Sequence, residues 1–263
     1  MTNWRSIVLT GASSGIGAAL AERLAAPGTK LLLVGRNHAR LEAVAAQVTA
    51  RGGMAEIAAI DVTNRDLLAD RLSAFDDAHP VDLVIANAGI SSGLNAERNE
   101  EPSDIARKVI ETNLVGMLNT VETLVAPMIA RGSGQLALMS SLAGVRPFAD
   151  MPSYSAAKAG VRAWGIAARG WLKPHGIRVS VICPGFVTSP MSARHVGPKP
   201  FEVSAEAAAE KIVRALSRRK AMIAFPWPMV VLLWLGNLVP PTISDFFERR
   251  FAARIEPGED QQP

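Results

Sequence analysis

The feature that most constrains this chain is a short apolar segment that runs into a glycine-rich turn and then into an alanine-rich helix. Residues 6–10 predict a buried strand, and the following GASSGIGAALAERLAA has glycines at positions 11, 15 and 17. Glycine permits the tight turn and lets a pyrophosphate approach the N–H groups at a helix N-terminus, where Ser13 and Ser14 can add hydroxyl donors. A glycine-rich turn can also be a plain connection, but the order strand, turn, helix favours dinucleotide binding.

Apolar strand-like segments then alternate with helical segments along the chain. We expect strands at residues 6–10, 30–34, 55–60, 83–86, 135–139, 177–182 and 221–225. We expect helices at 38–50, from about Ser103 as N-cap, through 154–173, and over 205–217 with Ser204 as N-cap. The sequence therefore predicts the α/β class: a single-domain, doubly wound parallel sheet of about seven strands over residues 1–225, an apolar extension of the same domain (226–255) and a disordered tail (256–263).

The composition argues against several classes of protein. The single cysteine, Cys183, rules out an internal disulfide framework and suits a reducing cytosol, so we expect a cytoplasmic location. MTNWRSIVLTG at the start has no basic region followed by a long apolar run, so we expect no signal peptide. The four histidines lack metal-ligand spacing, and we predict no metal site. The formal net charge is only +4, with one basic run at residues 218–220, which disfavours nucleic-acid binding and suits a phosphate-bearing cofactor.

The only tyrosine of the chain, Tyr154, is followed four positions later by Lys158 in the run YSAAK. On a helix this spacing puts both side chains on one face. A lysine charge about 4 Å from the phenol is worth roughly 4 kcal/mol at an effective dielectric of about 20, enough to lower the tyrosine pKa by about three units. The pair is therefore a candidate for proton transfer, although the same spacing also occurs on solvated helices.

The second expected strand ends in Gly35-Arg36, where an NAD site usually has a carboxylate. Arg36 could meet a 2′-phosphate, so we favour NADP(H), with NAD(H) as the alternative; Arg36 could also be a surface cation at a helix start. Asp61, followed by Val62, could cap the next helix or contact an adenine edge. After the fourth strand, Asn87-Ala88-Gly89 allows close passage beside a nucleotide.

Further candidates lie in the second half of the fold. The fifth strand delivers Ser140-Ser141 at its carboxyl end, where open α/β sheets bind their ligands. Asn113 falls in an apolar helical pattern, where such a residue is usually a satisfied core amide. Residues 188–203 form a loop that could close over a substrate, and Cys183 is expected to be a small buried side chain.

Taken in order, these motifs resemble those of the short-chain dehydrogenase/reductase family over residues 6–225. They read TGASSGIG (10–17), DV (61–62), NAG (87–89), Asn113, SSLAG (140–144), YSAAK (154–158) and PG (184–185). One departure is visible: the family often has a second asparagine where this chain has Ala86, which weakens a sheet contact and touches no catalytic role.

The resemblance implies a Rossmann-like fold, a small-molecule carbonyl or alcohol substrate, a homodimer or homotetramer, and specific residue roles. Tyr154 would be the general acid or base, Lys158 would tune it and hold the nicotinamide ribose, Ser141 would bind the substrate oxygen, and Asn113 would hold a water that relays protons. Ser140 would be structural. Cofactor contacts would come from Gly11, Ser13, Ser14, Gly15, Ile16, Gly17, Arg36, Asp61, Val62, Asn87, Ala88, Gly89, Tyr154, Lys158, Pro184, Gly185 and Thr188.

The extension after residue 225 is not explained by the resemblance. Its apolar core, residues 229–235, is too short to span a bilayer, and Ile243, Phe246, Phe247 and Phe251 would share one helical face. It could cover the substrate pocket or a subunit interface, carry a peripheral membrane contact with Trp227 and Trp234, or be ordinary core. We expect a rather apolar substrate on this basis. A non-catalytic nucleotide-sensing protein and a group transferase remain as alternative functions.

Overall fold

The computed structural model describes residues 4–95, 97–240 and 254–255, and a seven-stranded sheet forms its centre. Neighbouring strands all pair in parallel, in the order β3-β2-β1-β4-β5-β6-β8. The strands are β1 (Ser6–Thr10), β2 (Lys30–Gly35), β3 (Met54–Ala59), β4 (Leu83–Ala86), β5 (Gly134–Met139), β6 (Ile177–Pro184) and β8 (Met222–Phe225). The predicted single-domain, doubly wound α/β fold is confirmed.

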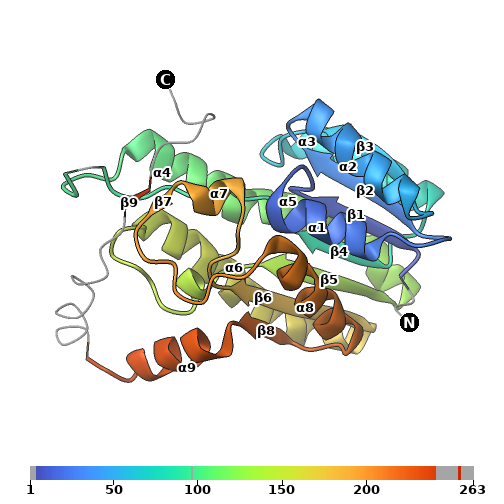
Figure 1. Ribbon diagram of the computed structural model, residues 1–263. Coiled ribbons are helices and arrows are strands. Elements are labelled where there is room, and N and C mark those ends of the chain that lie inside the picture. Colours follow the sequence, from blue (N-terminus) through green and yellow to red (C-terminus); the bar gives the residue numbers. More distant parts are fainter. Residues whose placement is uncertain (1–3, 96, 241–253, 256–263) are drawn as a thin grey trace.

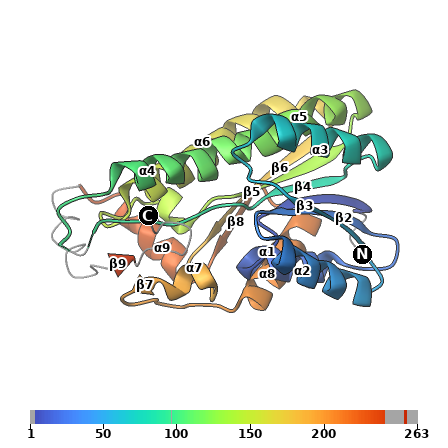
Figure 2. The same cartoon turned by 90° about the horizontal axis from the view of Figure 1, so that it is seen from above.

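Helices cover both faces of this sheet (Figures 1 and 2). On one face lie α1 (Gly15–Leu24), α2 (His38–Ala50) and α8 (Ala205–Ser217); on the other lie α3 (Arg65–Ala78), α4 (Ser103–Ile110), α5 (Gly116–Arg131) and α6 (Pro152–Leu172). Successive side chains of a strand point to opposite faces. Ile7 and Leu9 of β1 therefore join the core with α1, whereas Val8 between them joins the core with α5.

The order of the strands reverses at β1. The chain runs outward from β1 through β2 to β3, then returns so that β4 pairs with the other edge of β1. In open α/β sheets the crevice at such a reversal, outside the carboxyl ends of the strands, is where ligands bind. The turn after β1 and the Asn87–Gly89 run after β4 both begin at this crevice.

Two expectations about helix caps need correction. Ser103 is the first residue of α4 rather than its N-cap, which is Pro102. Asp61 does not cap α3: its Oδ1 accepts hydrogen bonds from Thr63 in the preceding turn, and Asn64 caps the helix by accepting from the backbone N–H of Leu67. Short polar side chains can serve both turns and caps, so sequence alone does not choose between them.

The segment expected to be a loop, residues 188–203, contains regular structure. It holds a short helix, α7 (Pro190–Ala193), and a two-residue strand, β7 (His195–Val196), which pairs antiparallel with β9 (Arg254–Ile255). The apolar extension begins with α9 (Trp227–Gly236). The amphipathic face expected at 243–251 and the tail expected at 256–263 lie outside the described residues.

The longest apolar helical stretch of the described chain is continuous from α4 to α5. A π-helical turn (Glu111–Val115) joins the two helices, and the stretch from Ser103 to Arg131 is long and apolar enough to cross a membrane by length and composition. Its apolar side, however, packs on the sheet, where Val121, Leu124 and Met128 are fully buried. A helix that forms one layer of a domain core can also reach this length and apolar composition, so the stretch is weak evidence for a membrane span.

Candidate active site

A cavity of about 1390 Å³ opens at the carboxyl ends of the strands, and it reaches from the turn after β1 to α9. Its lining includes the glycine-rich turn, the ends of β2 and β3, the Asn87–Gly89 run, the loop after β5, the start of α6 and one side of α9. The cavity therefore brings together segments that are far apart in the sequence and that motif spacing had assigned to one site.

The glycines of the first turn are required by its geometry. Gly11 and Gly15 have φ angles of +65° and +53°, a region that disfavours other residues. A Cβ on Gly17 would lie 2.0 Å from the carbonyl oxygen of Gly11, and a Cβ on Gly11 would lie 2.7 Å from Cα of Ala88. The chain is thus folded as closely as backbone atoms allow, and a side chain at Gly11 or Gly17 would collide with the turn itself or with the Asn87–Gly89 run.

The start of α1 offers its N–H groups to this space. The N-cap residue, Ser14, has an extended backbone and makes no side-chain cap hydrogen bond. The turn is held instead from β4, since Asn87 donates from Nδ2 to the carbonyls of Thr10 (3.1 Å) and Gly11 (3.0 Å). Thr10 Oγ1 in turn accepts from the N–H groups of Asn87 and Ala88. A preorganised helix N-terminus of this kind binds anions such as phosphate.

Two arginines and one carboxylate lie where the cavity passes the ends of β2 and β3. Arg36 and Asp61 form an ion pair at 4.0 Å, with about two fifths of each side chain exposed. Arg40 lines the same part of the cavity, one turn into α2, whose N-cap Asn37 accepts from the Arg40 N–H at 2.9 Å. This end of the cavity is therefore cationic, although Asp61 provides a carboxylate that the second strand itself lacks.

Tyr154 and Lys158 lie on the cavity side of α6, with Ser141 facing them from the loop after β5. The Lys158 ammonium lies 5.7 Å from the centre of the Tyr154 ring and donates to the carbonyl of Met139 at 2.9 Å. Ser140 is buried, and its hydroxyl donates to the Lys158 carbonyl at 2.7 Å, as suits a structural serine. Ser141 caps the short 3₁₀ turn Leu142–Gly144 by accepting from the N–H of Ala143.

The expected direction of the Tyr154 pKa shift is wrong. Burial raises the pKa of Tyr154, and a hydrogen bond with Ser141 opposes this only in part. Burial also lowers the pKa of Lys158 from 10.5 to about 8. The spacing predicted that the two side chains share a face, but it did not show how deeply they are buried. The Lys158 ammonium donates to the carbonyl of Met139, and the desolvation of both groups outweighs the attraction of the ammonium for a phenolate.

Asn113 lies behind this pair, outside the cavity lining, within the π-helical turn. Its side chain is 1% exposed and is satisfied by the backbone of Ile90: Oδ1 accepts from the N–H at 2.9 Å and Nδ2 donates to the carbonyl at 2.8 Å. A Cβ on Gly89 would lie 2.5 Å from Asn113 Oδ1 and 3.3 Å from Lys158 Nζ. Asn113 therefore anchors the loop that borders the lysine, and its relay role stays a prediction.

Apart from Asn113 and Thr188, the predicted site residues all line the cavity. Thr188 is exposed, and its backbone N–H donates to the carbonyl of Val203 at 2.9 Å. The next residue, Ser189, lines the cavity instead, caps α7 in a capping box with Ser192, and approaches the position of a Gly15 Cβ to 3.0 Å. A serine followed by proline is a helix-start signal that could have identified it.

The part of the cavity beyond Tyr154 contains residues that sequence reasoning did not assign. Arg194 donates to the carbonyl and hydroxyl oxygens of Ser91 at 3.2 and 3.1 Å. The His195 ring packs at a tilt of 59° against Phe186 with centroids 4.7 Å apart, and burial lowers the pKa of His195. No metal cluster occurs among the described residues. These positions lie in the segment expected to close over a substrate, but nothing in their spacing singles them out.

The cavity has a glycine-rich turn for a dinucleotide at one end, and Ser141, Tyr154 and Lys158 lie together further along it. This combination defines a nicotinamide-dependent oxidoreductase of the α/β class. The family model for short chain dehydrogenases matches residues 5–198, and the chain belongs to that family. It is an enzyme of the short-chain dehydrogenase/reductase type, as the motifs predicted.

Relatives cover nearly the whole chain. An uncharacterized oxidoreductase of Myxococcus xanthus is 35% identical over 94% of this chain and 98% of its own length. The ketoacyl reductase HetN of Nostoc sp. is 30% identical over 97% of this chain and 95% of its own length. Among solved structures, levodione reductase superposes with a TM-score of 0.74 at 27% identity, covering 84% of this chain and 95% of the other. A metagenomic short-chain oxidoreductase in complex with NADP superposes with a TM-score of 0.71 at 28% identity, and it covers the same shares of the two chains.

Proposed function

We propose that this protein reduces the carbonyl group of a small molecule to a secondary alcohol with NADPH, with Tyr154 as the general acid. One observation carries the proposal: Tyr154, Lys158 and Ser141 line the same cavity as the glycine-rich turn, so a proton donor and a hydrogen-bond donor for a carbonyl oxygen lie beside the space for a dinucleotide. The same tyrosine would serve as the base in alcohol oxidation.

Arg36 and Arg40 support NADP(H) over NAD(H). Both line the end of the cavity that would receive the adenosine ribose, and guanidinium groups suit a 2′-phosphate because their N–H groups match its oxygens. Asp61, 4.0 Å from Arg36, leaves NAD(H) as the alternative, since a carboxylate could accept from a free ribose hydroxyl. The NADP complex of the similar metagenomic oxidoreductase is consistent with the first choice.

When bound, the cofactor supplies the hydride that adds to the carbonyl carbon. The Ser141 hydroxyl would donate a hydrogen bond to the carbonyl oxygen and orient it beside the Tyr154 phenol. The phenol would then transfer its proton to that oxygen. With its pKa near 8, Lys158 can be charged or neutral around neutral pH, so it can hold ribose hydroxyls and return a proton to the tyrosine. A water held near Asn113 would connect this lysine to solvent.

The relative named as a ketoacyl reductase supports a carbonyl substrate in general terms. A cytoplasmic location and a homodimer or homotetramer belong to the same proposal, and the reduced, fully buried Cys183 is compatible with that location. A peripheral membrane contact is not part of the proposal, because one side of α9 lines the cavity.

The test is a panel of ketones and alcohols assayed by NADPH and NADH absorbance, with Tyr154→Phe as the diagnostic variant. We expect turnover of at least one ketone with NADPH, and a loss of about 10²–10⁴-fold in kcat for the variant. NADPH binding, followed by its fluorescence, should persist in the variant. NADPH binding without turnover across the panel would favour a nucleotide-sensing protein, and binding of another nucleotide in its place would favour a group transferase.

A further inference from the structure

We infer that α9 forms the wall that selects the substrate, and that it selects ketones with a long, unbranched aliphatic chain. The inference rests on the proposed carbonyl reduction and names the substrate class for it. It comes from the way the side chains of one entirely non-polar helix divide between the cavity and the surface.

The sequence of α9, WPMVVLLWLG, contains no charged residue and no amide or hydroxyl side chain. A helix that is apolar on all sides is normally buried on all sides. Here only Leu233 is buried, against Leu142, Val181 and Cys183. Met229 and Val230 are partly buried against the same cluster, and the remaining side chains need a different explanation from core packing.

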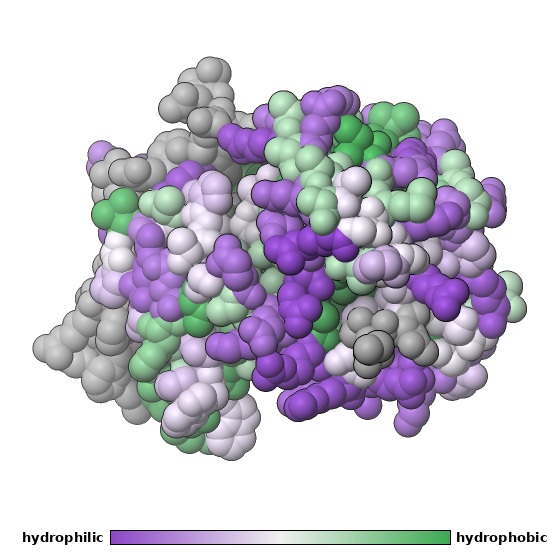
Figure 3. Space-filling model, turned by 45° about the vertical axis from the view of Figure 1, so that its right-hand side comes forward, coloured by the Kyte–Doolittle hydropathy of each residue, from purple (hydrophilic) through white to green (hydrophobic). Residues whose placement is uncertain are grey.

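Helical spacing separates these side chains into two stripes. Met229, Leu232, Leu233 and Gly236 are related by three- and four-residue steps, and all four line the cavity; Leu235, at the border of the two stripes, lines it as well. Trp227, Val231, Trp234 and Leu238 follow the same steps on another side; none lines the cavity, and their exposures are 75%, 46%, 60% and 69%. Figure 3 shows green and pale side chains gathered over α9 at the lower left.

The cavity stripe is tied directly to the reacting end of the site. Arg146, five residues after Ser141, donates from Nη1 to the carbonyl of Gly236 at 2.9 Å and to Asn237 Oδ1 at 3.3 Å. Asn237 Nδ2 donates back to the carbonyl of Val145 at 3.2 Å. A cation at a helix C-terminus also interacts favourably with the helix dipole. The loop that carries Ser141 therefore fixes the place of α9.

The shape and chemistry of this wall indicate the substrate. From Met229 to Gly236 the lining extends over about two turns of α9, roughly 11 Å of helix, and Val239 beyond its end lines the cavity too. Its side chains are leucine, methionine and valine, and Phe148 and Phe201 line the cavity as well. The charged groups nearby have partners: Arg146 binds the end of α9, Arg194 binds Ser91, and Asp150 forms an ion pair with Arg98. A long apolar wall suits an extended alkyl chain better than a compact or polar molecule.

The test is a series of unbranched methyl ketones from 2-butanone to 2-decanone, with cyclohexanone as a compact comparison. For the unmodified enzyme we expect kcat/KM with NADPH to rise about three- to fourfold per methylene, as burial of each group against α9 requires. The melting temperature should rise more with 2-decanone than with 2-butanone, which tests binding without turnover.

Two neighbouring substitutions provide the matched control. Leu232→Asp places a carboxylate in the cavity stripe and should lower the ratio of kcat/KM for 2-decanone over 2-butanone at least tenfold. Val231→Asp, on the exposed stripe one residue away, should leave that ratio unchanged. Both positions are exposed, at 60% and 46%, so both variants should fold.

Turnover of ketones without any dependence on chain length, or an equal loss in both variants, would overturn the inference while leaving carbonyl reduction intact. Absence of turnover with every ketone, despite NADPH binding, would overturn the proposed function and the substrate class together.

Discussion

The carboxylate of Glu101 accepts hydrogen bonds from Ser153 at the start of α6, from its hydroxyl at 2.7 Å and from its backbone N–H at 3.2 Å. Tyr154 is the next residue. The N-cap residue of α6, Met151, makes no side-chain cap hydrogen bond, and Pro152 has no N–H. Glu101 thus takes the place of the missing cap from a distant part of the chain, and it fixes the end of the helix that carries the proposed acid.

We predict that Glu101→Ala lowers kcat about tenfold and the free energy of unfolding by about 1 kcal/mol, the usual effect of a lost cap. The Michaelis constant for NADPH should change little, because Glu101 does not line the cavity. The measurements are steady-state kinetics and urea unfolding. Glu100→Ala, at an exposed neighbour, is the control. If both variants behaved alike, the contact with Ser153 would have no role in positioning Tyr154.

The buried amine of Lys158 should lower the free energy of unfolding at neutral pH. Its pKa is lowered from 10.5 to about 8 by burial, so between these values the unfolded chain binds a proton that the folded chain lacks. The stability contribution of this group therefore rises with pH across that window, and below pH 8 the buried charge carries its full cost. We expect Lys158→Met to raise the free energy of unfolding at pH 7 by up to about 3 kcal/mol while abolishing turnover.

Urea unfolding at pH 7 and pH 10 checks this prediction, since the gain should shrink at the higher pH. Lys173→Met, an exposed lysine after the end of the same helix, should show neither effect. A loss of stability in Lys158→Met at both pH values would mean that the hydrogen bond to Met139 outweighs the desolvation of the amine.

Arg36 should decide the choice of cofactor. Its removal would take away a donor for a 2′-phosphate and leave Asp61 without its ion-pair partner, so Arg36→Ala should lower kcat/KM for NADPH about 10–100-fold, as expected when a charged contact worth about 1.5–3 kcal/mol is lost. The value for NADH should change little. Arg65→Ala, an exposed pair with Glu122, is the matched control. An equal loss for both cofactors would contradict a 2′-phosphate contact.

The fold was predictable because its determinants are local. Continuous apolar runs such as residues 31–34, bounded by helical segments, admit few arrangements other than a parallel sheet covered on both faces. The glycine turn was predictable for the same reason: its φ angles and close contacts leave no alternative to glycine at positions 11, 15 and 17. The bounds expected for β1 (residues 6–10) and α2 (residues 38–50) match those of the structure, because local signals set them.

The electrostatics of the site were not predictable from spacing. A four-residue step places Tyr154 and Lys158 on one face, but the depth of that face depends on how α6 packs against β5. The carbonyl of Met139 that binds the lysine comes from this strand. The role of α9 likewise depends on Arg146, ninety residues before Gly236, and no local pattern connects the two.

The last prediction concerns stability away from the cavity. Asp76, at the end of α3, is 5% exposed; it accepts from both terminal nitrogens of Arg131 at 2.7 and 2.9 Å and from the N–H of Val81 at 2.8 Å. Asp76→Ala removes the hydrogen bonds of a buried carboxylate and leaves the N–H of Val81 without this partner, so it should lower the free energy of unfolding by about 2–3 kcal/mol. Turnover per folded molecule should be unchanged.

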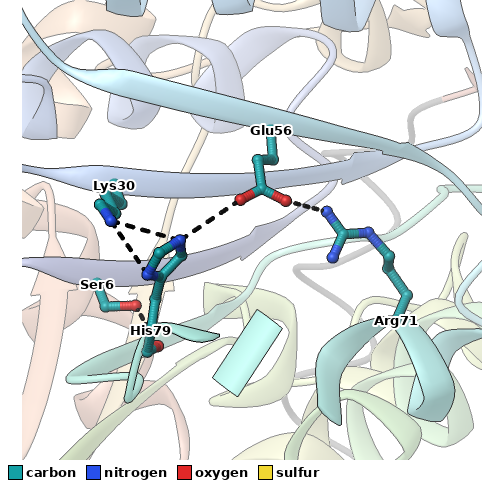
Figure 4. Close-up of polar contacts among 5 residues, drawn as sticks. All are labelled: Ser6, Lys30, Glu56, Arg71 and His79. Atoms are coloured by element: carbon teal, nitrogen blue, oxygen red, sulfur yellow. Dashed lines mark hydrogen bonds and ion pairs between the residues drawn. The ribbon is translucent and has the colours of Figure 1, made fainter. Parts of the chain in front are cut away.

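A more exposed network provides the comparison. Figure 4 shows Glu56 between Arg71 and His79, with Lys30 3.1 Å from the Nδ1 of that histidine. About half of the Glu56 side chain is exposed, so Glu56→Gln should cost only about 0–1 kcal/mol. Urea unfolding of the two variants measures the difference. Similar losses in both would show that burial does not set the strength of these ion pairs, because the two sites differ mainly in their access to water.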